Sequence, residues 1–412
     1  MRDDIGLFCP PSLGTTDIRV EVVDVDEFAQ AGDAWRDLVS RTAVPNVFME
    51  PAVVLALDRS TGIDIRVLMA WHVTAGDMGG DKPPRLLGVW VVTVGRSPSG
   101  LPIRILKSPI SKYAYFGAPV VDTEYASAVF TALFDRIALD PKLPKLLLAG
   151  DMMDEGPLAD ALRGALAARG SRAVVIERRK RAKLQSDLTG SSYLGRSLSG
   201  NRRRRYQQLR KRLALMGAVT TTSHRSSNEV RSAFEDFLLL EASGWKGKRR
   251  SAILNDAKST AFARAMIADL AEADLVAIHA LRLDGRAIAM SVELRSGAAC
   301  FAWRISFDES LRQFAPGILL LHEVTVALLD DRSIVVTDSC NHRDVGFVAD
   351  CWAERLSIVD LLIDTRPARA AMIETVGGAE RLRRRARENA KSLYKAAKRW
   401  GASVYKGHAR GS

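Results

Sequence analysis

Three side chains in the second half of the sequence could exchange a proton in catalysis. Asp338 follows the apolar run 334–336, and a carboxylate at the end of such a strand often faces a cleft. Glu293 and His279 lie in two neighbouring apolar segments, and either group could take a proton from an amine. Each has a structural alternative, because a carboxylate can cap a turn or lie on a solvated strand face, and a histidine can be hydrogen-bonded in the core. We expect Asp338 to be the first candidate for a general base.

Four further residues could contact a substrate. Trp245 and Lys246 stand together in SGWKGK, where an indole beside an ammonium between glycines suits an anionic or sugar-bearing ligand. The alternative is that Trp245 fills the core between helices. Arg304 and Asp308 flank the end of an apolar segment. They could orient a donor or an acceptor, or they could pair with each other.

Hydrophobic periodicity predicts the elements that must position these residues. In the first half we expect strands at 18–24, 63–73, 84–94, 101–107, 145–151 and 171–177, and helices at 26–42, 46–59, 123–138 and 156–169. In the second half we expect helices at 200–216, 227–243, 258–272 and 317–329, and strands at 218–224, 275–283, 286–295, 298–307, 333–339 and 355–363. Antiparallel strands followed by alternating helices and strands indicate an α/β protein with mixed (α+β) sheets.

The composition is that of a soluble globular protein. Hydrophobic residues make up 47% and charged residues 26% of the chain, and 412 residues are enough for two or three domains. No run of about 20 apolar residues indicates a membrane span, and no signal-peptide pattern is found. The four cysteines form no regular framework, which is typical of a reducing cytoplasm, and Cys340, His342 and Cys351 match no standard zinc spacing. We therefore expect a cytoplasmic protein without a bound metal.

Positive charge is concentrated in two segments of the chain. Residues 172–212 and 366–412 carry net charges of +12 and +10, whereas the whole chain carries +12. The second segment has apolar residues at helical spacing, from Leu382 to Trp400, among arginines and lysines. This pattern suits a helix that lies on an anionic membrane surface, and the alternative is a solvated helix packed on the body. The inner membrane is therefore a candidate peripheral location.

The first basic segment contains the run SGNRRRRYQQLRKRL at 199–213. Its spacing predicts an amphipathic helix with Tyr206, Leu209 and Leu213 on the buried side. Recognition of nucleic acid usually brings aromatic platforms or a known module, and the sequence has neither, so we do not expect nucleic acid as a partner. An anion is expected instead, such as the phosphates of acyl-CoA, a nucleotide-linked sugar or a lipid headgroup.

The order of these elements and several local sequences resemble the GNAT acyltransferase superfamily, in particular its CelD-like (cellulose-biosynthesis-type) branch, which is related to the FemAB peptidyl transferases. The similar segments span the chain to about residue 365: AWRDLVSRTAVPNVFMEP (34–51), KYAYFGAPVVD (112–122), SLSGNRRRRYQQLRKRLALMG (197–217), EASGWKGKRRSAI (241–253), RLDGRAIAMSVEL (282–294), AWRISFDESLRQFAPGILLLHEVTVALL (302–329) and VVTDSCNH (335–342). The resemblance implies two tandem GNAT-like units, at 1–180 and 218–365. A linker with a basic bridging helix at 181–217 would join them, and a basic C-terminal helix and tail would follow at 366–412.

The resemblance also implies where acyl-CoA, the expected co-substrate, would bind. GNAT folds hold its pyrophosphate at the N-terminus of a helix, where free N–H groups and the helix dipole favour an anion. In this chain the matching residues lie in the second unit: Arg312, Gln313, Pro316, Gly317 and Ile318. No permanently bound cofactor is implied.

The function implied by the resemblance is acyl-CoA-dependent N-acylation of an amine in cell-envelope metabolism. The acceptor would be a lipid amine such as a long-chain base, or an amino sugar of a polysaccharide. Two alternatives stay open: a FemAB-like transferase that uses aminoacyl-tRNA, and a non-catalytic GNAT-fold scaffold at the membrane. The scaffold is suggested by SCNHRDVGFVADCWAE, which begins just after Asp338, because relatives commonly have a glycine-rich turn and a Tyr-Lys pair there.

Overall fold

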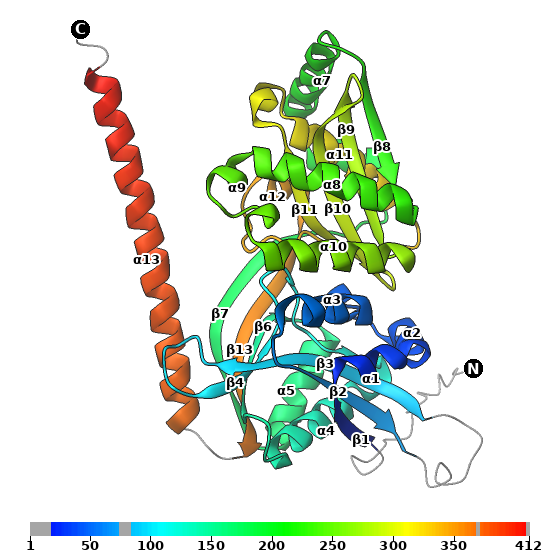
Figure 1. The fold of residues 1–412 in the computed structure, drawn as a ribbon, viewed down its shortest axis with the longest axis vertical. Coiled ribbons are helices and arrows are strands. Elements are labelled where there is room, and N and C mark those ends of the chain that lie inside the picture. The colour runs from blue at the N-terminus through cyan, green and yellow to red at the C-terminus, as the bar shows by residue number, and fades with distance from the viewer. Residues whose placement is uncertain (1–17, 74–83, 368–370, 409–412) are drawn as a thin grey trace, which may run out of the picture.

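The computed structural model describes residues 18–73, 84–367 and 371–408 (Figure 1). In the last helix, the side chains of residues 391, 392 and 394–408 lie outside the description. The part of the expected apolar stripe that includes Trp400 therefore lies outside the described residues, as does Cys9.

The described strands form one mixed sheet that runs through both halves of the molecule. Its spatial order is β1 (Ile18–Val23), β2 (Ile65–His72), β3 (Arg85–Arg96), β4 (Arg104–Ser108), β6 (Leu146–Met153), β13 (Glu354–Pro367), β7 (Ser171–Leu184), β12 (Val336–Asp338), β11 (Ala299–Phe307), β10 (Arg286–Ser296), β9 (Val276–Leu283) and β8 (Val219–His224). The short β5 (Val120–Val121) pairs with β3. Two pairs, β4–β6 and β11–β12, are parallel, and the others are antiparallel. The mixed α/β class predicted from the sequence is confirmed.

Helices pack against this sheet in both halves. The first half contains α1 (Val25–Gln30), α2 (Gly32–Arg41), α3 (Pro51–Thr61), α4 (Ala126–Leu139) and α5 (Pro157–Ala168), with the short 3-10 helices η2 (Val47–Met49) and η3 (Thr123–Tyr125). The second half contains α6 (Gly190–Ser197), α7 (Gly200–Ala214), α8 (Ser227–Ser243), α9 (Trp245–Lys248), α10 (Ala257–Glu272), α11 (Pro316–Asp330) and α12 (Phe347–Cys351), with η4 (Ile253–Asn255) and η5 (Glu309–Phe314). The last helix is α13 (Ala371–His408). Helices α3 and α10 pack against each other and so connect the two halves (Figure 1).

Local sequence signals explain where several helices begin and end. Asp24 caps α1 by accepting a hydrogen bond from the backbone N–H of Glu27 at 2.9 Å, and the Glu27 side chain completes the capping box. Pro51 occupies the first turn of α3, and Gly62 ends that helix in the left-handed conformation with φ of 64°. The single helix expected at 26–42 is interrupted at Ala31, which separates α1 from α2.

The last strand of the sequence lies among strands of the first half. β13 pairs with β6 on one side and with β7 on the other, whereas the sequence pattern groups 355–363 with the second half. β7 is also longer than the strand expected at 171–177. Its last two residues, Lys183 and Leu184, pair with β12 of the second half. One long strand therefore joins both halves into a single sheet.

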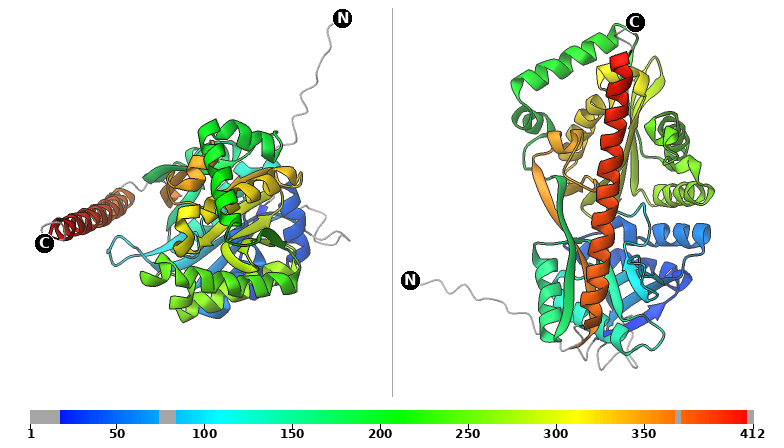
Figure 2. Two further views of the ribbon diagram at one scale, coloured as in Figure 1. Left: turned by 90° about the horizontal axis from the view of Figure 1, so that it is seen from above. Right: turned by 90° about the vertical axis from the view of Figure 1, so that its left-hand side faces the viewer.

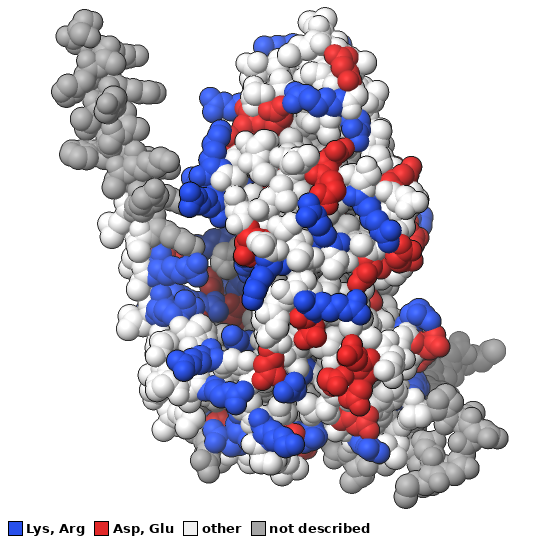
Figure 3. Space-filling view, in the orientation of Figure 1, with Lys and Arg blue, Asp and Glu red and all other residues white. Residues whose placement is uncertain are grey.

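The two basic segments take up different positions. Helix α7 lies at the end of the second half that is farthest from the first half (Figure 1), and its Leu209 and Leu213 are buried as predicted. Helix α13 begins with Ile373 and Val376 buried against the sheet, and it then extends away from the body (Figure 2). Acidic and basic side chains are interspersed over the face shown in Figure 3. A bilayer-spanning segment is not found among the helices that the structure describes.

Candidate active site

The parallel strands β11 and β12 pair over only three residues each and then separate. Residues Ala299–Phe301 pair with Val336–Asp338, and β11 then continues to Phe307 paired with β10 but no longer with β12. A cavity of about 390 Å³ lies at this opening, a size typical of small-molecule sites. We call it the groove, and it is lined by Tyr115, Trp245, Lys246, Ser291, Glu293, Ala302, Trp303, Arg304, Ile305, Phe307, Leu321, Val324, Ser339, Cys340, Asn341, His342, Phe347, Val348 and Trp352.

A β-bulge lies in the wall of the groove. Val292 of β10 pairs with Arg304 of β11, and the next residue, Glu293, pairs with Ala302. Trp303 is therefore an extra residue in β11. A bulge bends its strand and changes which side chains face a site, and bulges are frequent beside active sites.

Glu293 is a buried carboxyl in the groove wall. Its side chain is 2% exposed, and burial raises its pKa to about 8. Its Oε2 atom has no hydrogen-bond partner among the described residues, and the Nε2 atom of His279 lies 3.8 Å away. Burial lowers the pKa of His279 to about 4, so its imidazole is neutral near pH 7. The two residues therefore place a neutral imidazole beside a carboxyl group that can gain or lose a proton near neutral pH.

Asp338 lies outside the groove lining, in a buried ion pair. Arg181 of β7 pairs with its Oδ2 atom and also donates to the carbonyl of Tyr115 at 2.8 Å. The other carboxylate oxygen, Oδ1, accepts the backbone N–H of Cys340 at 2.9 Å. This position differs from the expectation of a free carboxylate facing a cleft, because an arginine from a distant part of the sequence neutralises it.

Lys246 and Arg304 line the groove, but both are bound to one buried carboxylate. Glu241 of α8 accepts hydrogen bonds from Nζ of Lys246 at 2.8 Å, from the guanidinium of Arg304, and from the backbone N–H of Ile253 at 2.9 Å. Burial lowers the pKa of Lys246, and the charge of Arg304 acts in the same direction. Two cations that share one carboxylate leave net positive charge in the groove wall, which suits an anionic group.

Trp245 lies partly exposed in the groove lining, whereas Asp308 lies outside that lining. Trp245 is 48% exposed at the groove, so it does not fill the core between helices, and the guanidinium of Arg249 lies 5.2 Å from its ring centroid. Asp308 lies outside the groove lining and forms an ion pair with Arg286 at 2.8 Å. Asp308 and Arg304 therefore have separate ion-pair partners, Arg286 and Glu241 respectively.

None of the residues expected to hold a pyrophosphate lines the groove, but one of them, Gly317, packs against Phe307, which does. The first two are exposed in η5, and the other three begin α11: Arg312, Gln313, Pro316, Gly317 and Ile318. A Cβ atom on Gly317 would lie 2.9 Å from the Cδ1 atom of Phe307, which itself lines the groove. The N-terminus of α11 is therefore next to the groove, with Phe307 between them.

The first half has the same parallel strand pair, but its opening is filled by its own chain. β4 and β6 pair over three residues each, and the segment 109–118 then passes between them. The carbonyl of Gly117 accepts hydrogen bonds from Oγ of Ser108 at 2.8 Å and from Nε1 of Trp90 at 3.1 Å. A Cβ atom on Gly117 would lie only 2.3 Å from the carbonyl oxygen of Gly150 in β6. The segment 109–118 therefore fills the opening between β4 and β6.

Sequence reasoning missed the contribution of this segment to the site. Tyr115, within 109–118, lines the groove of the second half, and burial raises its pKa, so the hydroxyl stays protonated near neutral pH. The aromatic cluster KYAYFG was the available signal, but the sequence does not say which cavity the cluster reaches. Ser339, Asn341 and His342, which follow β12, were missed as well. Within the described ranges, no group of three or more His, Cys, Asp or Glu side chains is placed to hold a metal ion.

Comparison with known proteins gives a match for the region that contributes more than half of the groove lining. Residues 200–333 match the family model of the acetyltransferase (GNAT) domain. The search of curated proteins gives no match. Among solved structures, FemX is 14% identical with a TM-score of 0.55 over 84% of this chain and 96% of FemX. The C-terminal domain of a putative lysylphosphatidylglycerol synthetase from Agrobacterium fabrum is 12% identical, with a TM-score of 0.48 over 86% of this chain and 95% of that domain. A tandem GNAT protein from the clavulanic acid biosynthesis pathway is 11% identical, with a TM-score of 0.38 over 85% of this chain and 100% of that protein. Residues 200–333 therefore match the acetyltransferase (GNAT) domain, and the fold of the chain is similar to that of FemX.

Proposed function

We propose that the protein is an acyl-CoA-dependent N-acyltransferase whose donor binds in the groove of the second half. The observation that carries the proposal is the continuity of this groove, which runs from Phe307 beside the start of α11 to the buried carboxyl of Glu293. The N-terminus of a helix favours an anion through its free N–H groups and its dipole. The donor pyrophosphate would bind there, with Arg312 and Gln313 as additional donors, and the thioester would reach the bulge at Trp303.

In the proposed reaction an amine attacks the thioester carbonyl. A C–N bond forms, the C–S bond breaks, and Glu293 takes the proton that the amine loses. A pKa of about 8 suits this role, because the group is partly ionised near neutral pH and is basic enough to accept a proton. The protonated hydroxyl of Tyr115, in the same groove, would supply a proton to the leaving thiolate. We assign the base role to Glu293 rather than Asp338, since Asp338 is bound to Arg181.

Trp245 and the positive pair Lys246 and Arg304 would contact the acceptor or its anionic groups. The acceptor class that fits the proposal is an amine of cell-envelope metabolism, either a lipid amine or an amino sugar. A partly exposed indole can stack on a sugar or cover an alkyl chain, while the neighbouring cations hold an anionic group. The filled opening of the first half supports a single donor site per chain.

The first experiment is thermal stabilisation by CoA, acetyl-CoA and palmitoyl-CoA, because a ligand that binds the native state raises the melting temperature. The variant Arg312→Glu places a negative charge beside the pyrophosphate position, and Arg332→Glu is a control with the same charge change at another exposed arginine. We expect stabilisation of the wild type and of Arg332→Glu, and a much smaller effect in Arg312→Glu. If CoA, acetyl-CoA and palmitoyl-CoA all fail to raise the melting temperature at millimolar concentration, the assignment of acyl-CoA as the donor is refuted.

The similarity to FemX favours one alternative, a FemAB-like transferase that takes its acyl group from aminoacyl-tRNA. The arginines of α7 other than Arg210, for which no ion pair is found among the described residues, could then contact RNA phosphates. In that case tRNA should copurify with the protein in an RNase-sensitive manner, and acyl-CoA should have no effect on stability. A non-catalytic scaffold at the membrane would bind neither donor.

We also propose that α13 contacts an anionic membrane surface. Leu382 and Leu393 are each 69% exposed on a helix rich in arginine and lysine. Deletion of residues 389–412 keeps the first turns, which pack on the body through Ile373 and Val376. We expect the deletion to weaken binding to phosphatidylglycerol vesicles strongly and to leave acyl-CoA binding unchanged. Undiminished vesicle binding by the truncated protein would contradict a role for α13.

A further inference from the structure

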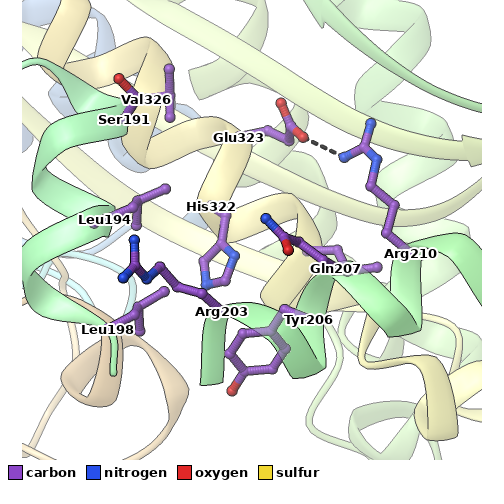
Figure 4. A pocket seen from close by; sticks show the side chains of 12 residues that line it. Ser191, Leu194, Leu198, Arg203, Tyr206, Gln207, Arg210, His322, Glu323 and Val326 are labelled. Atoms are coloured by element: carbon purple, nitrogen blue, oxygen red, sulfur yellow. Dashed lines mark hydrogen bonds and ion pairs between the residues drawn. The ribbon is translucent and has the colours of Figure 1, made fainter. Parts of the chain in front are cut away.

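A second cavity, of about 360 Å³, lies between α6, α7 and α11 (Figure 4), and its lining residues place it on the opposite side of α11 from the groove. Leu321 and Val324 of α11 face the groove, whereas Leu319, His322 and Val326 face this second cavity. The other walls are formed by α6 and α7. We call it the α7 pocket. Since α11 separates the two cavities, a ligand in the α7 pocket would not occupy the donor groove.

The interior of the α7 pocket is mainly apolar. Leu194 and Leu198 line it from α6 and the residue after it, and Leu319 and Val326 line it from α11. Tyr206 of α7 packs edge-on against the ring of His322 at a centroid distance of 5.0 Å. An apolar cavity of this volume is within the range of sites that bind small molecules, and an alkyl chain would fill it favourably.

One polar atom in this wall lacks a partner. The Nε2 atom of His322 is buried and makes no hydrogen bond within the described residues. Burial lowers the pKa of His322 to about 4, so the imidazole is neutral near pH 7. A buried polar atom without a hydrogen bond is unfavourable, and a ligand that supplies one would remove this cost. A ligand in the pocket that hydrogen-bonds to this imidazole would therefore be stabilised.

The mouth of the pocket is positively charged. The guanidinium of Arg203 lies beside Leu194 and Leu198 (Figure 4), and no ion pair is found for Arg203 in the part of the chain that the structure describes. Arg210, also in the lining, is instead neutralised by Glu323 of α11. Arg203 is therefore the cation of this pocket that is free to meet an anion, at the edge of an apolar interior.

We propose that the α7 pocket binds an anionic amphiphile. The alkyl chain of the ligand would lie among the leucines, and its phosphate or carboxylate group would pair with Arg203. A polar group of the ligand would also hydrogen-bond to Nε2 of His322. The inference is independent of the donor groove and of the proposed acyl transfer. The same chemistry is offered by a free long-chain anion and by an anionic phospholipid, and the two sources are distinguished by the experiment.

The test is an isothermal titration calorimetry experiment, in which the heat of binding of decyl phosphate to the full-length protein is measured. Decyltrimethylammonium has the same chain with the opposite charge, and inorganic phosphate has the charge without the chain. We expect saturable binding of decyl phosphate, and no saturable binding of decyltrimethylammonium or of inorganic phosphate. Arg203→Glu should weaken it by at least about tenfold, because a charge-assisted contact is replaced by repulsion. Arg202→Glu is the matched control, with the same charge change one residue away on α7 and outside the pocket lining, and it should bind like the wild type.

A second variant tests the interior of the pocket. Leu194→Trp should fill the cavity and abolish binding of decyl phosphate, while a retained far-UV spectrum and melting temperature verify folding. A vesicle-binding experiment identifies the source of the amphiphile. Binding to phosphatidylglycerol vesicles is compared between the chain truncated at residue 388 and the same truncated chain with Arg203→Glu. Vesicle binding that depends on Arg203 indicates a membrane lipid, and binding of the soluble amphiphile alone indicates a free one. Equal weakening by Arg202→Glu, or undiminished binding by Leu194→Trp, would overturn the proposal.

Discussion

The variant Glu293→Gln should make the protein more stable at alkaline pH and nearly inactive. In the folded protein burial raises the pKa of Glu293 to about 8, compared with an ordinary value of 4.5. Below pH 4.5 the group is protonated in both the folded and the unfolded states, so it contributes no difference. Between pH 4.5 and 8 the unfolded chain releases the proton while the folded protein keeps it, so stability falls as pH rises.

The size of this effect follows from the two pKa values. Each pKa unit corresponds to about 1.4 kcal/mol, so the full cost above pH 8 is about 5 kcal/mol. Glutamine has nearly the same shape as the protonated carboxyl but cannot ionise, and it should remove most of the cost. For a chain of this length, we expect the melting temperature at pH 9 to rise by roughly 5 °C, with no rise at pH 5.

The assay compares wild type and variant in melting temperature from pH 5 to 9 and in thioester cleavage at pH 8. Wild-type activity should increase with pH up to about 8, because the base must be ionised to accept a proton. Glu50→Gln is the matched control: Glu50 is also buried, with a pKa raised to about 7, but it is bound by Trp35 and Ser296 outside the groove. It should change stability without reducing activity. The reasoning on Glu293 would be refuted by a variant that is fully active, or whose stability relative to wild type does not depend on pH.

Three further predictions concern buried groups away from the reacting atoms. Arg181→Met should lower the free energy of unfolding by about 3–5 kcal/mol, because it leaves the Asp338 carboxylate buried without its cation, and adding Asp338→Leu should restore much of the loss in chemical denaturation. Gly117→Ala should destabilise the protein by about 2 kcal/mol, because its Cβ would overlap backbone atoms of the neighbouring strand. Gly378→Ala is the control for Gly117→Ala, because a Cβ there would lie in open space on α13, and it should be neutral or slightly stabilising in the same measurement. His322→Phe should reduce the loss of stability as pH falls from 6.5 to 4, since the folded state binds the proton only near pH 4 whereas the unfolded chain binds it at 6.5; identical acid-denaturation curves for variant and wild type would contradict this.

The strands and helices could largely be predicted from the sequence, because their periodicity is a local property. The alternation of apolar residues predicts the antiparallel strands of the second half, and the run 199–213 predicts α7 with Leu209 and Leu213 on its buried side, as the structure has them. Composition and element order likewise indicate a mixed α/β protein. The short α6 and α12 were not predicted, since they span only 8 and 5 residues, which is too short for a helical period to stand out.

The candidate site depended on tertiary structure, because charges and cavities are formed by residues far apart in the sequence. Asp338 has the local pattern of a catalytic carboxylate, yet Arg181 from β7 neutralises it. Glu293 ranks below Asp338 as a candidate in the sequence, but burial without a hydrogen-bond partner for Oε2 among the described residues raises its pKa to about 8. Tyr115 reaches the groove only because the first half packs against the second. Local periodicity is enough to predict most strands and helices. Which buried charges are paired and which are free to react depends on neighbours from distant parts of the chain, because only the folded protein brings them together and removes them from water.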